Sequence, residues 1–154
     1  AGGAEFDCSQ KQYDDMVAKD KLYAEAEAVY RRFFEEDVRI FRLGGISEPS
    51  PVLLDTTMGD FRNDSMALYR SFLEEGRKSV GGEIRLASLE RVPGASKGGS
   101  VVALRACVDA SSTKTVSSGS APERGGFGSD LLYFGRSGGV LKIQGADGEA
   151  VQSC

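Results

Sequence analysis

A thiol and a carboxylate two residues apart, Cys107 and Asp109, are the first candidates for chemistry in this chain. Residues two apart on an extended strand point to the same side, so these two side chains lie close together. A nearby carboxylate raises the pKa of a thiol, which is the wrong direction for a nucleophilic thiolate. We therefore expect Asp109 to be structural, accepting hydrogen bonds from Ser111 or Ser112 in an Asx-type turn.

The chain offers few other groups for catalysis or for binding a metal or cofactor. It has no histidine, the commonest general base and metal ligand, and its three cysteines lack the spacing of a zinc site. The acidic run from Glu35 to Asp37 lacks the turn residues of a calcium loop. The glycine-rich stretch 125–128 neither opens a helix nor carries the lysine of a phosphate-binding loop. We predict no metal site and no cofactor.

Length and charge limit the possible partners. With 154 residues the chain has the size of one domain, predicted to span residues 9–154 after a flexible N-terminal segment, residues 1–8. The net charge of −4 makes nucleic acid an unsuitable partner, because no basic patch is available to neutralise phosphates. No apolar run reaches the roughly 18 residues that a membrane span needs. We expect membrane attachment, if any, only through a lipid anchor that has been removed.

The elements that must position these residues begin with a long helix. Ser9 is a suitable N-cap, and apolar residues recur at steps of three, four and seven from Met16 to Phe41. Gly44 and Gly45 are a natural helix end. The charged residues, including the acidic run, fill the opposite face and are interpreted as solvated.

Two shorter helices are predicted next. Ser50 followed by Pro51 is typical of an N-cap and the first helical position, so a short helix should precede Gly59. Asn63 is then predicted to cap a third helix that ends at Gly76.

The second half of the chain changes to the period of two that strands show. In the stretch 101–109, Val102, Leu104, Ala106 and Val108 alternate with polar residues and predict a half-buried central strand. Further strands are predicted at 83–92, 113–116 (short), 128–135 and 139–145, with a turn at 146–148. The fold class is therefore α+β, with N-terminal helices, one long and two shorter, packed on a curved antiparallel sheet of about four strands.

This order of elements resembles the nuclear-transport-factor-2-like (cystatin-like) α+β cone. The spacing also resembles a group of secreted or lipid-anchored proteins of unknown function from Gram-positive bacteria. Those proteins carry a strand ending in Cys-x-Asp, a Gly-rich turn, a Trp-Lys-Val-like last strand and a terminal Gly-x-Cys-like tail. The matching residues here are Cys107 to Asp109, Gly119, Leu141 to Ile143, and Cys154, with Leu141 in place of the usual Trp. The resemblance covers roughly residues 12–154.

The resemblance implies a pocket between sheet and helices, and an extracytoplasmic location at the cell envelope. The side chains that it makes pocket candidates are Tyr30, Phe34, Tyr69 and Tyr133. Our first hypothesis is a non-enzymatic domain that binds a small apolar ligand or a protein partner there. Another is a self-associating envelope component that forms a homodimer through the outer face of the sheet.

A rival hypothesis from another class is an isomerase-like enzyme. Relatives of that kind need an Asp base in the pocket, here Asp55 or Asp60, and a Tyr opposite it. Cyclase and dehydratase relatives that use His with Asp are excluded, because the chain has no His. Tyrosine at helical spacing is more often part of the core, so we expect no catalytic residues. A buried aspartate within hydrogen-bonding reach of a pocket tyrosine would count against this expectation.

The three cysteines allow either one disulfide or three free thiols. A final Cys154 on a polar, Gly-rich tail contributes little as a buried apolar residue, and the last strand should lie close to the central one. We therefore predict a disulfide between Cys107 and Cys154, on the outer face of the sheet, with Cys8 as the odd thiol. Such a bond would place the protein outside the cytoplasm.

Overall fold

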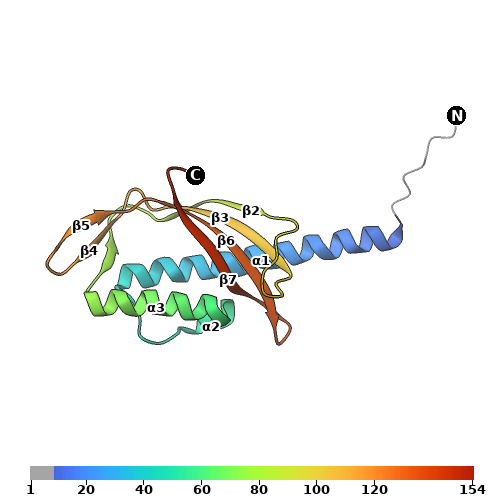
Figure 1. Ribbon diagram of the computed structural model, residues 1–154, viewed down its shortest axis with the longest axis horizontal. Helices are drawn as coiled ribbons and strands as arrows, with labels where there is room; N and C mark the ends of the chain where they lie inside the picture. Colours follow the sequence, from blue (N-terminus) through green and yellow to red (C-terminus); the bar gives the residue numbers. More distant parts are fainter. Residues whose placement is uncertain (1–8) are drawn as a thin grey trace.

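The architecture is that of the predicted α+β class, seen in a computed structural model that describes residues 9–154 (Figure 1). The predicted flexible segment 1–8, which contains Cys8, lies outside the described residues. The helices are α1 (Gln10–Leu43), α2 (Pro51–Thr56) and α3 (Gly59–Glu75). The strands are β1 (Lys78–Val80), β2 (Arg85–Arg91), β3 (Val102–Asp109), β4 (Lys114–Ser117), β5 (Ser120–Arg124), β6 (Phe127–Ser137) and β7 (Val140–Val151).

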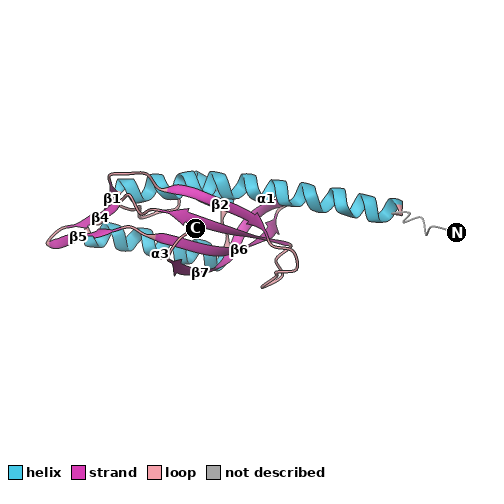
Figure 2. Cartoon of the chain, turned by 90° about the horizontal axis from the view of Figure 1, so that it is seen from above, coloured by secondary structure: helices cyan, strands magenta, loops and turns pink. Residues whose placement is uncertain are grey.

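The strands form two antiparallel sheets. The larger has the order β2-β3-β6-β7, and its four strands are those predicted. The smaller has the order β1-β4-β5; of these only β4 was predicted, as the short strand 113–116. Figure 2, seen from above, shows α1 and α3 running along the strands on one side of the larger sheet. The β4–β5 hairpin extends past the end of that sheet (Figure 1).

The caps predicted for the first two helices are confirmed. The Ser9 hydroxyl accepts from the Gln12 N–H and the Gln12 side chain accepts from the Ser9 N–H, so each side chain satisfies the backbone N–H of the other residue. Gly44 ends α1 with a left-handed φ of 95°, which a residue without Cβ adopts freely. Ser50 caps α2, and Pro51 is its first residue.

The prediction that Asn63 caps α3 is wrong, because that helix begins four residues earlier at Gly59. Its N-cap position is Met58, whose side chain makes no capping bond. The backbone N–H of Met58 instead donates to the Ile143 carbonyl oxygen of β7, at 2.9 Å. A contact between residues far apart in sequence therefore fixes where α3 starts.

The turn predicted at 146–148 is also wrong, since β7 runs through it to Val151. Ala146 lies opposite Leu132, and Gly148 lies opposite Asp130 of β6. Pairing along the whole length of β6 satisfies the backbone here, and this overrides the local turn preference of the Asp-Gly pair.

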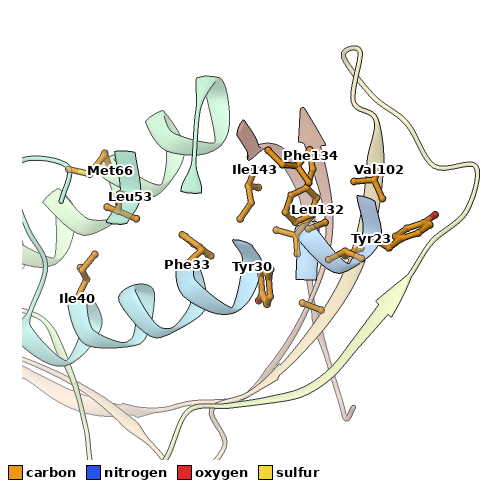
Figure 3. Packing of buried hydrophobic residues seen from close by; sticks show 14 of the residues in the cluster. Tyr23, Tyr30, Phe33, Ile40, Leu53, Met66, Val102, Leu132, Phe134 and Ile143 are labelled. Atoms are coloured by element: carbon orange, nitrogen blue, oxygen red, sulfur yellow. The ribbon is translucent and has the colours of Figure 1, made fainter. Parts of the chain in front are cut away.

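The core lies between α1, α3 and the inner face of the larger sheet (Figure 3). Val102, Leu104 and Ala106 of β3 are buried on that face, as the alternation predicts. Phe33 of α1, only 6% exposed, belongs to the same cluster. The other buried members are Tyr23, Ala26, Tyr30, Ile40, Leu53, Met66, Tyr69, Leu132, Phe134, Leu141 and Ile143.

The first turns of α1 extend past the end of the sheet (Figure 1). Residues 10–21 are exposed, and Met16, predicted to begin the buried face, is 65% exposed. The buried face begins at Tyr23, because strands cover the helix only from there. The predicted helix is correct, but its buried face was predicted to begin at Met16, seven residues too early.

Candidate functional site

A cavity of about 230 Å³ lies where α1 and α3 meet the smaller sheet and the end of β3. We call it the Asp37 cavity after the one charged side chain in its lining. Its other lining residues are Phe41, Phe72, Ser79, Ile84, Val108, Ala110, Thr113, Thr115 and Gly125. The walls are therefore apolar side chains and hydroxyl groups around a single carboxyl group.

Asp37 stands where the helical period calls for an apolar residue. It is seven residues after Tyr30 and four after Phe33, both of which face the core. The acidic run that contains it is interpreted from the sequence as a solvated face, and for Asp37 that interpretation is wrong. Its position on the core stripe, between Phe33 and Phe41, was the available indication.

A hydrogen bond from α3 holds the Asp37 side chain. The Tyr69 hydroxyl donates to Asp37 Oδ1 at 2.5 Å, and Tyr69 is fully buried. No group among the described residues donates a hydrogen bond to the second carboxylate oxygen, Oδ2. One oxygen is thus fixed, and the other remains available to a molecule in the cavity.

Close packing of the chain after α1 fixes the position of Tyr69. Gly45 has a φ of 96°, and a Cβ built on it would collide with the Tyr69 carbonyl oxygen. A glycine is therefore required for α3 to lie this close to the end of α1.

Burial dominates the electrostatics of the site. Loss of solvent raises the pKa of Asp37 to about 7, the Tyr69 hydrogen bond lowers it, and the charge of Asp130 adds to the rise. Burial likewise raises the pKa of Tyr69, where the Asp37 charge acts in the same direction. Asp37 therefore titrates close to neutral pH, far above its ordinary value of 3.8.

A second carboxyl group, Asp130, lies on the inner face of β6, in register with Ala106 of β3. Burial raises its pKa, and its charge acts on both Asp37 and Tyr30. Gly148 lies opposite it on β7, and a Cβ there would collide with the Asp130 carboxylate. Asp130 is not among the site residues predicted from the sequence. Its inward direction follows from the same alternation that buries Leu132.

Two of the four predicted pocket residues, Tyr30 and Tyr69, interact with Asp37, although neither is among the residues that line the cavity. Tyr69 bonds to Asp37, and Tyr30, 2% exposed, is near both acids; burial, Asp130 and Asp37, in that order, raise its pKa. Phe34 is half-buried beside Tyr30, but it lines a separate hollow together with Arg42 and Ile84. Phe34 therefore does not belong to the Asp37 cavity.

Tyr133 does not line the Asp37 cavity, but it lines a larger hollow of about 530 Å³. Tyr133 lies on the outer face of the larger sheet, where its hydroxyl donates to Asp147 at 2.9 Å. Lys97 pairs with the same carboxylate at 3.0 Å and lies over the Tyr133 ring. The predicted homodimer through this outer face, and the predicted protein partner, stay predictions.

The two aspartates proposed as an isomerase base lie elsewhere. Asp55 is exposed and pairs with Arg32 at 3.4 Å. Asp60 lines a larger hollow of about 530 Å³ between α3 and the outer face, together with Lys97 and Tyr133. In that hollow Lys97 already pairs with Asp147, and the two acids, Asp60 and Asp64, are exposed to solvent, so it is a weaker candidate for a ligand site.

The structural role predicted for Asp109 is confirmed. Its Oδ1 accepts from the Ser111 N–H at 2.9 Å and from the Ser111 hydroxyl at 2.6 Å, and Arg85 pairs with its Oδ2 at 2.9 Å. The Ser111 bonds, followed by Arg85, lower the pKa of Asp109 to about 2. The structure also joins Cys107 to Cys154 by a disulfide, as predicted, with a Cα–Cα distance of 5.8 Å.

Within residues 9–154, no group of three or more acidic, cysteine or histidine side chains is arranged to hold a metal ion. No helix in the same range has the length and apolar character needed to cross a membrane.

Comparisons with known proteins bear on the fold alone. No protein-family model matches the chain, and no curated protein sequence matches it. Its fold is similar to that of the intermembrane space region of the chloroplast protein ARC6, in a crystal structure. The TM-score is 0.50 at 12% sequence identity, over 83% of this chain and 95% of that one.

Proposed function

We propose that this chain is an extracytoplasmic, non-enzymatic domain that binds a small, mostly apolar ligand in the Asp37 cavity. The observation that carries the proposal is the cavity itself, whose apolar walls surround one carboxyl group. Ligand sites are commonly concave and apolar, with a few polar groups that orient the ligand. An apolar cavity of about 150 Å³ holds benzene in an engineered protein, so about 230 Å³ has room for one ring and a short side chain.

The disulfide supports the extracytoplasmic location. Disulfides persist in oxidising compartments and are rare where glutathione keeps thiols reduced. The bond between Cys107 and Cys154 ties the end of the chain to the central strand, and so has a structural role.

Benzene is a suitable first probe, and its binding can be followed by NMR through the amide resonances of isotope-labelled protein. We expect its largest shifts at Val108, Thr113 and Thr115, which line the cavity. Val108→Phe should fill part of the cavity and abolish these shifts, whereas Val140→Phe, on an exposed strand end, should leave them unchanged. Wild-type protein that shows no shift at these positions at saturating benzene would refute the proposal.

An acid–base enzyme is the second candidate, and one observation favours it. The Tyr69 hydroxyl lies within hydrogen-bonding reach of Asp37, an aspartate whose pKa is near neutral. This is the arrangement that counts against the expected lack of catalytic residues. We nevertheless prefer binding, because isomerase-like chemistry needs the Asp base and the Tyr donor on opposite sides of a substrate. Here the tyrosine proton is already engaged by the aspartate.

A proton-exchange assay distinguishes the two candidates. If Asp37 is a base, the protein should accelerate deuterium exchange beside the carbonyl of a small cyclic ketone in D₂O, and Asp37→Asn should remove the acceleration. Asp147→Asn is the matched control, since Asp147 also accepts from a tyrosine but lies outside the cavity. Exchange that depends on Asp37 would replace the binding proposal with the catalytic one.

A further inference from the structure

We propose that the ligand of the Asp37 cavity is an amine: a small apolar molecule whose ammonium group pairs with the Asp37 carboxylate. This inference rests on the proposed binding function and names the chemical class of the ligand. It follows from the charges around the cavity, the free oxygen of Asp37 and the nature of the walls.

Two acidic groups of the interior, Asp37 and Asp130, have no basic group among residues 9–154 to balance them, whereas the buried Glu36 pairs with Arg39. None of the ion pairs formed within residues 9–154 includes Asp37 or Asp130. Neither lysine nor arginine lines the cavity. Arg77 lies 4.5 Å from the Phe72 ring, but it pairs with Glu75 and lines a different hollow. A cation is therefore the charge that this interior lacks.

The free oxygen of Asp37 can receive that cation. Tyr69 occupies Oδ1, so Oδ2 is left to accept from a ligand. An N–H⁺ donor makes a stronger bond to a carboxylate than a neutral hydroxyl does. The same carboxylate would repel an anionic ligand, so a fatty or aromatic acid is disfavoured.

The remaining walls fit the rest of an ammonium group and its apolar carrier. Ser79 and Thr115 pair in register on β1 and β4, and their hydroxyl oxygens can accept further N–H bonds. The Thr113 hydroxyl donates to the Ala110 carbonyl oxygen, which leaves its own lone pairs as acceptors. The rings of Phe41 and Phe72, 4.9 Å apart, form the apolar wall.

Amine binding should depend on pH through Asp37. The titratable groups that act on Asp37 are Tyr69 of α3 and Asp130 of β6, and the charge of Asp37 in turn raises the pKa of Tyr30 on α1 itself. The cavity residues of β1 and β4 are Ser and Thr, which do not titrate in this range. Because the Asp37 pKa is about 7, affinity for an amine should fall below neutral pH and approach about a tenfold loss per pH unit. A neutral ligand should show no such loss.

The test uses three probes that carry a phenyl ring on a two-carbon chain and differ in the terminal group: 2-phenylethylamine, 2-phenylethanol and 3-phenylpropanoate. Dissociation constants are measured by titration calorimetry, or by amide shifts for weak binding, at pH 8 and pH 5.5. At pH 8 we expect the amine to bind about tenfold or more tightly than the alcohol, and the alcohol more tightly than the acid. At pH 5.5 the advantage of the amine over the alcohol should shrink toward unity.

Two variants identify the group responsible. Asp37→Asn should bring amine and alcohol to equal affinity at pH 8, and Asp147→Asn, the control outside the cavity, should keep the wild-type ratio. If Asp37→Asn does not fold, the pH dependence of the wild-type ratio is the deciding measurement. An alcohol that binds as tightly as the amine to wild-type protein at pH 8 would overturn the amine proposal while the binding function stands. Failure of all three probes to bind folded protein would overturn the binding function itself.

Discussion

Replacing Asp37 by Asn should change how stability depends on pH. The folded-state pKa of Asp37 is about 7, against an ordinary value of 3.8, so between these values the folded protein binds a proton that the unfolded chain has lost. The stability from this group is fully present below about pH 4, falls as pH rises through 7, and is constant above that. A difference of about three pKa units corresponds to at most about 4 kcal/mol, at 1.36 kcal/mol per unit.

The Asn variant keeps an acceptor for the Tyr69 hydroxyl and removes the charge. We therefore expect Asp37→Asn to be more stable than wild type at pH 8.5 by up to about 4 kcal/mol, with the gain decreasing toward zero near pH 4. Urea unfolding at pH 4, 5.5, 7 and 8.5, with the disulfide intact, measures this difference.

Asp147→Asn provides a control of opposite sign. The pKa of Asp147 is lowered by Lys97 and then by Tyr133, so its charged form stabilises the fold at neutral pH and its replacement should destabilise. A gain for Asp37→Asn that is the same at pH 4 and pH 8.5, or that grows toward low pH, would refute the assignment of Asp37 as a desolvated carboxyl group.

Three further predictions concern the frame around the site. Phe33→Ala should lower the free energy of unfolding by about 3–5 kcal/mol, because the side chain is 6% exposed; a loss under about 1 kcal/mol in urea would show that this face of α1 is not packed as described. Gly45→Ala should destabilise by more than about 1 kcal/mol, since its Cβ would collide with the Tyr69 carbonyl oxygen, and an unchanged thermal midpoint would contradict that contact. The bond between Cys107 and Cys154 predicts one free thiol in the unreduced, denatured chain, and a count of three would exclude the bond. Closing a loop of 47 residues should contribute about 4 kcal/mol to stability in the chain-entropy model.

The parts of the fold that local chemistry specifies could be predicted. Ser9 and Gly44 bound α1 because a hydroxyl cap and a left-handed glycine act within one helical turn. The alternation of apolar and polar residues through Leu104 and Ala106 predicted β3 and its buried face, because this pattern also depends only on residues close together in the chain. The start of α3 could not be predicted, because it depends on Ile143, more than 80 residues away in the chain.

The candidate site was predictable only in part. Tyr30 and Tyr69 lie on helical stripes, so their inward direction follows from the period of α1 and α3. Asp37 lies on the same stripe, but the neighbouring acids made it look like part of a solvated run. The cavity itself depends on β1 and β4 packing against both helices, and short, polar strands such as β1 carry almost no periodic pattern.

Two departures from good packing, a void and a desolvated carboxyl group, lie together at Asp37, and that supports a ligand site. An apolar side chain at position 37 would extend the stripe from Phe33 to Phe41, avoid the desolvation of a carboxyl group and reduce the void beside it. The chain instead has an acid there, a second acid at Asp130, and a glycine at position 148 that leaves room for it. The buried carboxyl group and the void beside it both cost stability when the cavity is empty, and a bound ammonium compound would offset both, since it balances the charge and fills the space. The ligand should therefore raise the stability of the protein most at the pH where the empty site is most destabilising, above the pKa of Asp37.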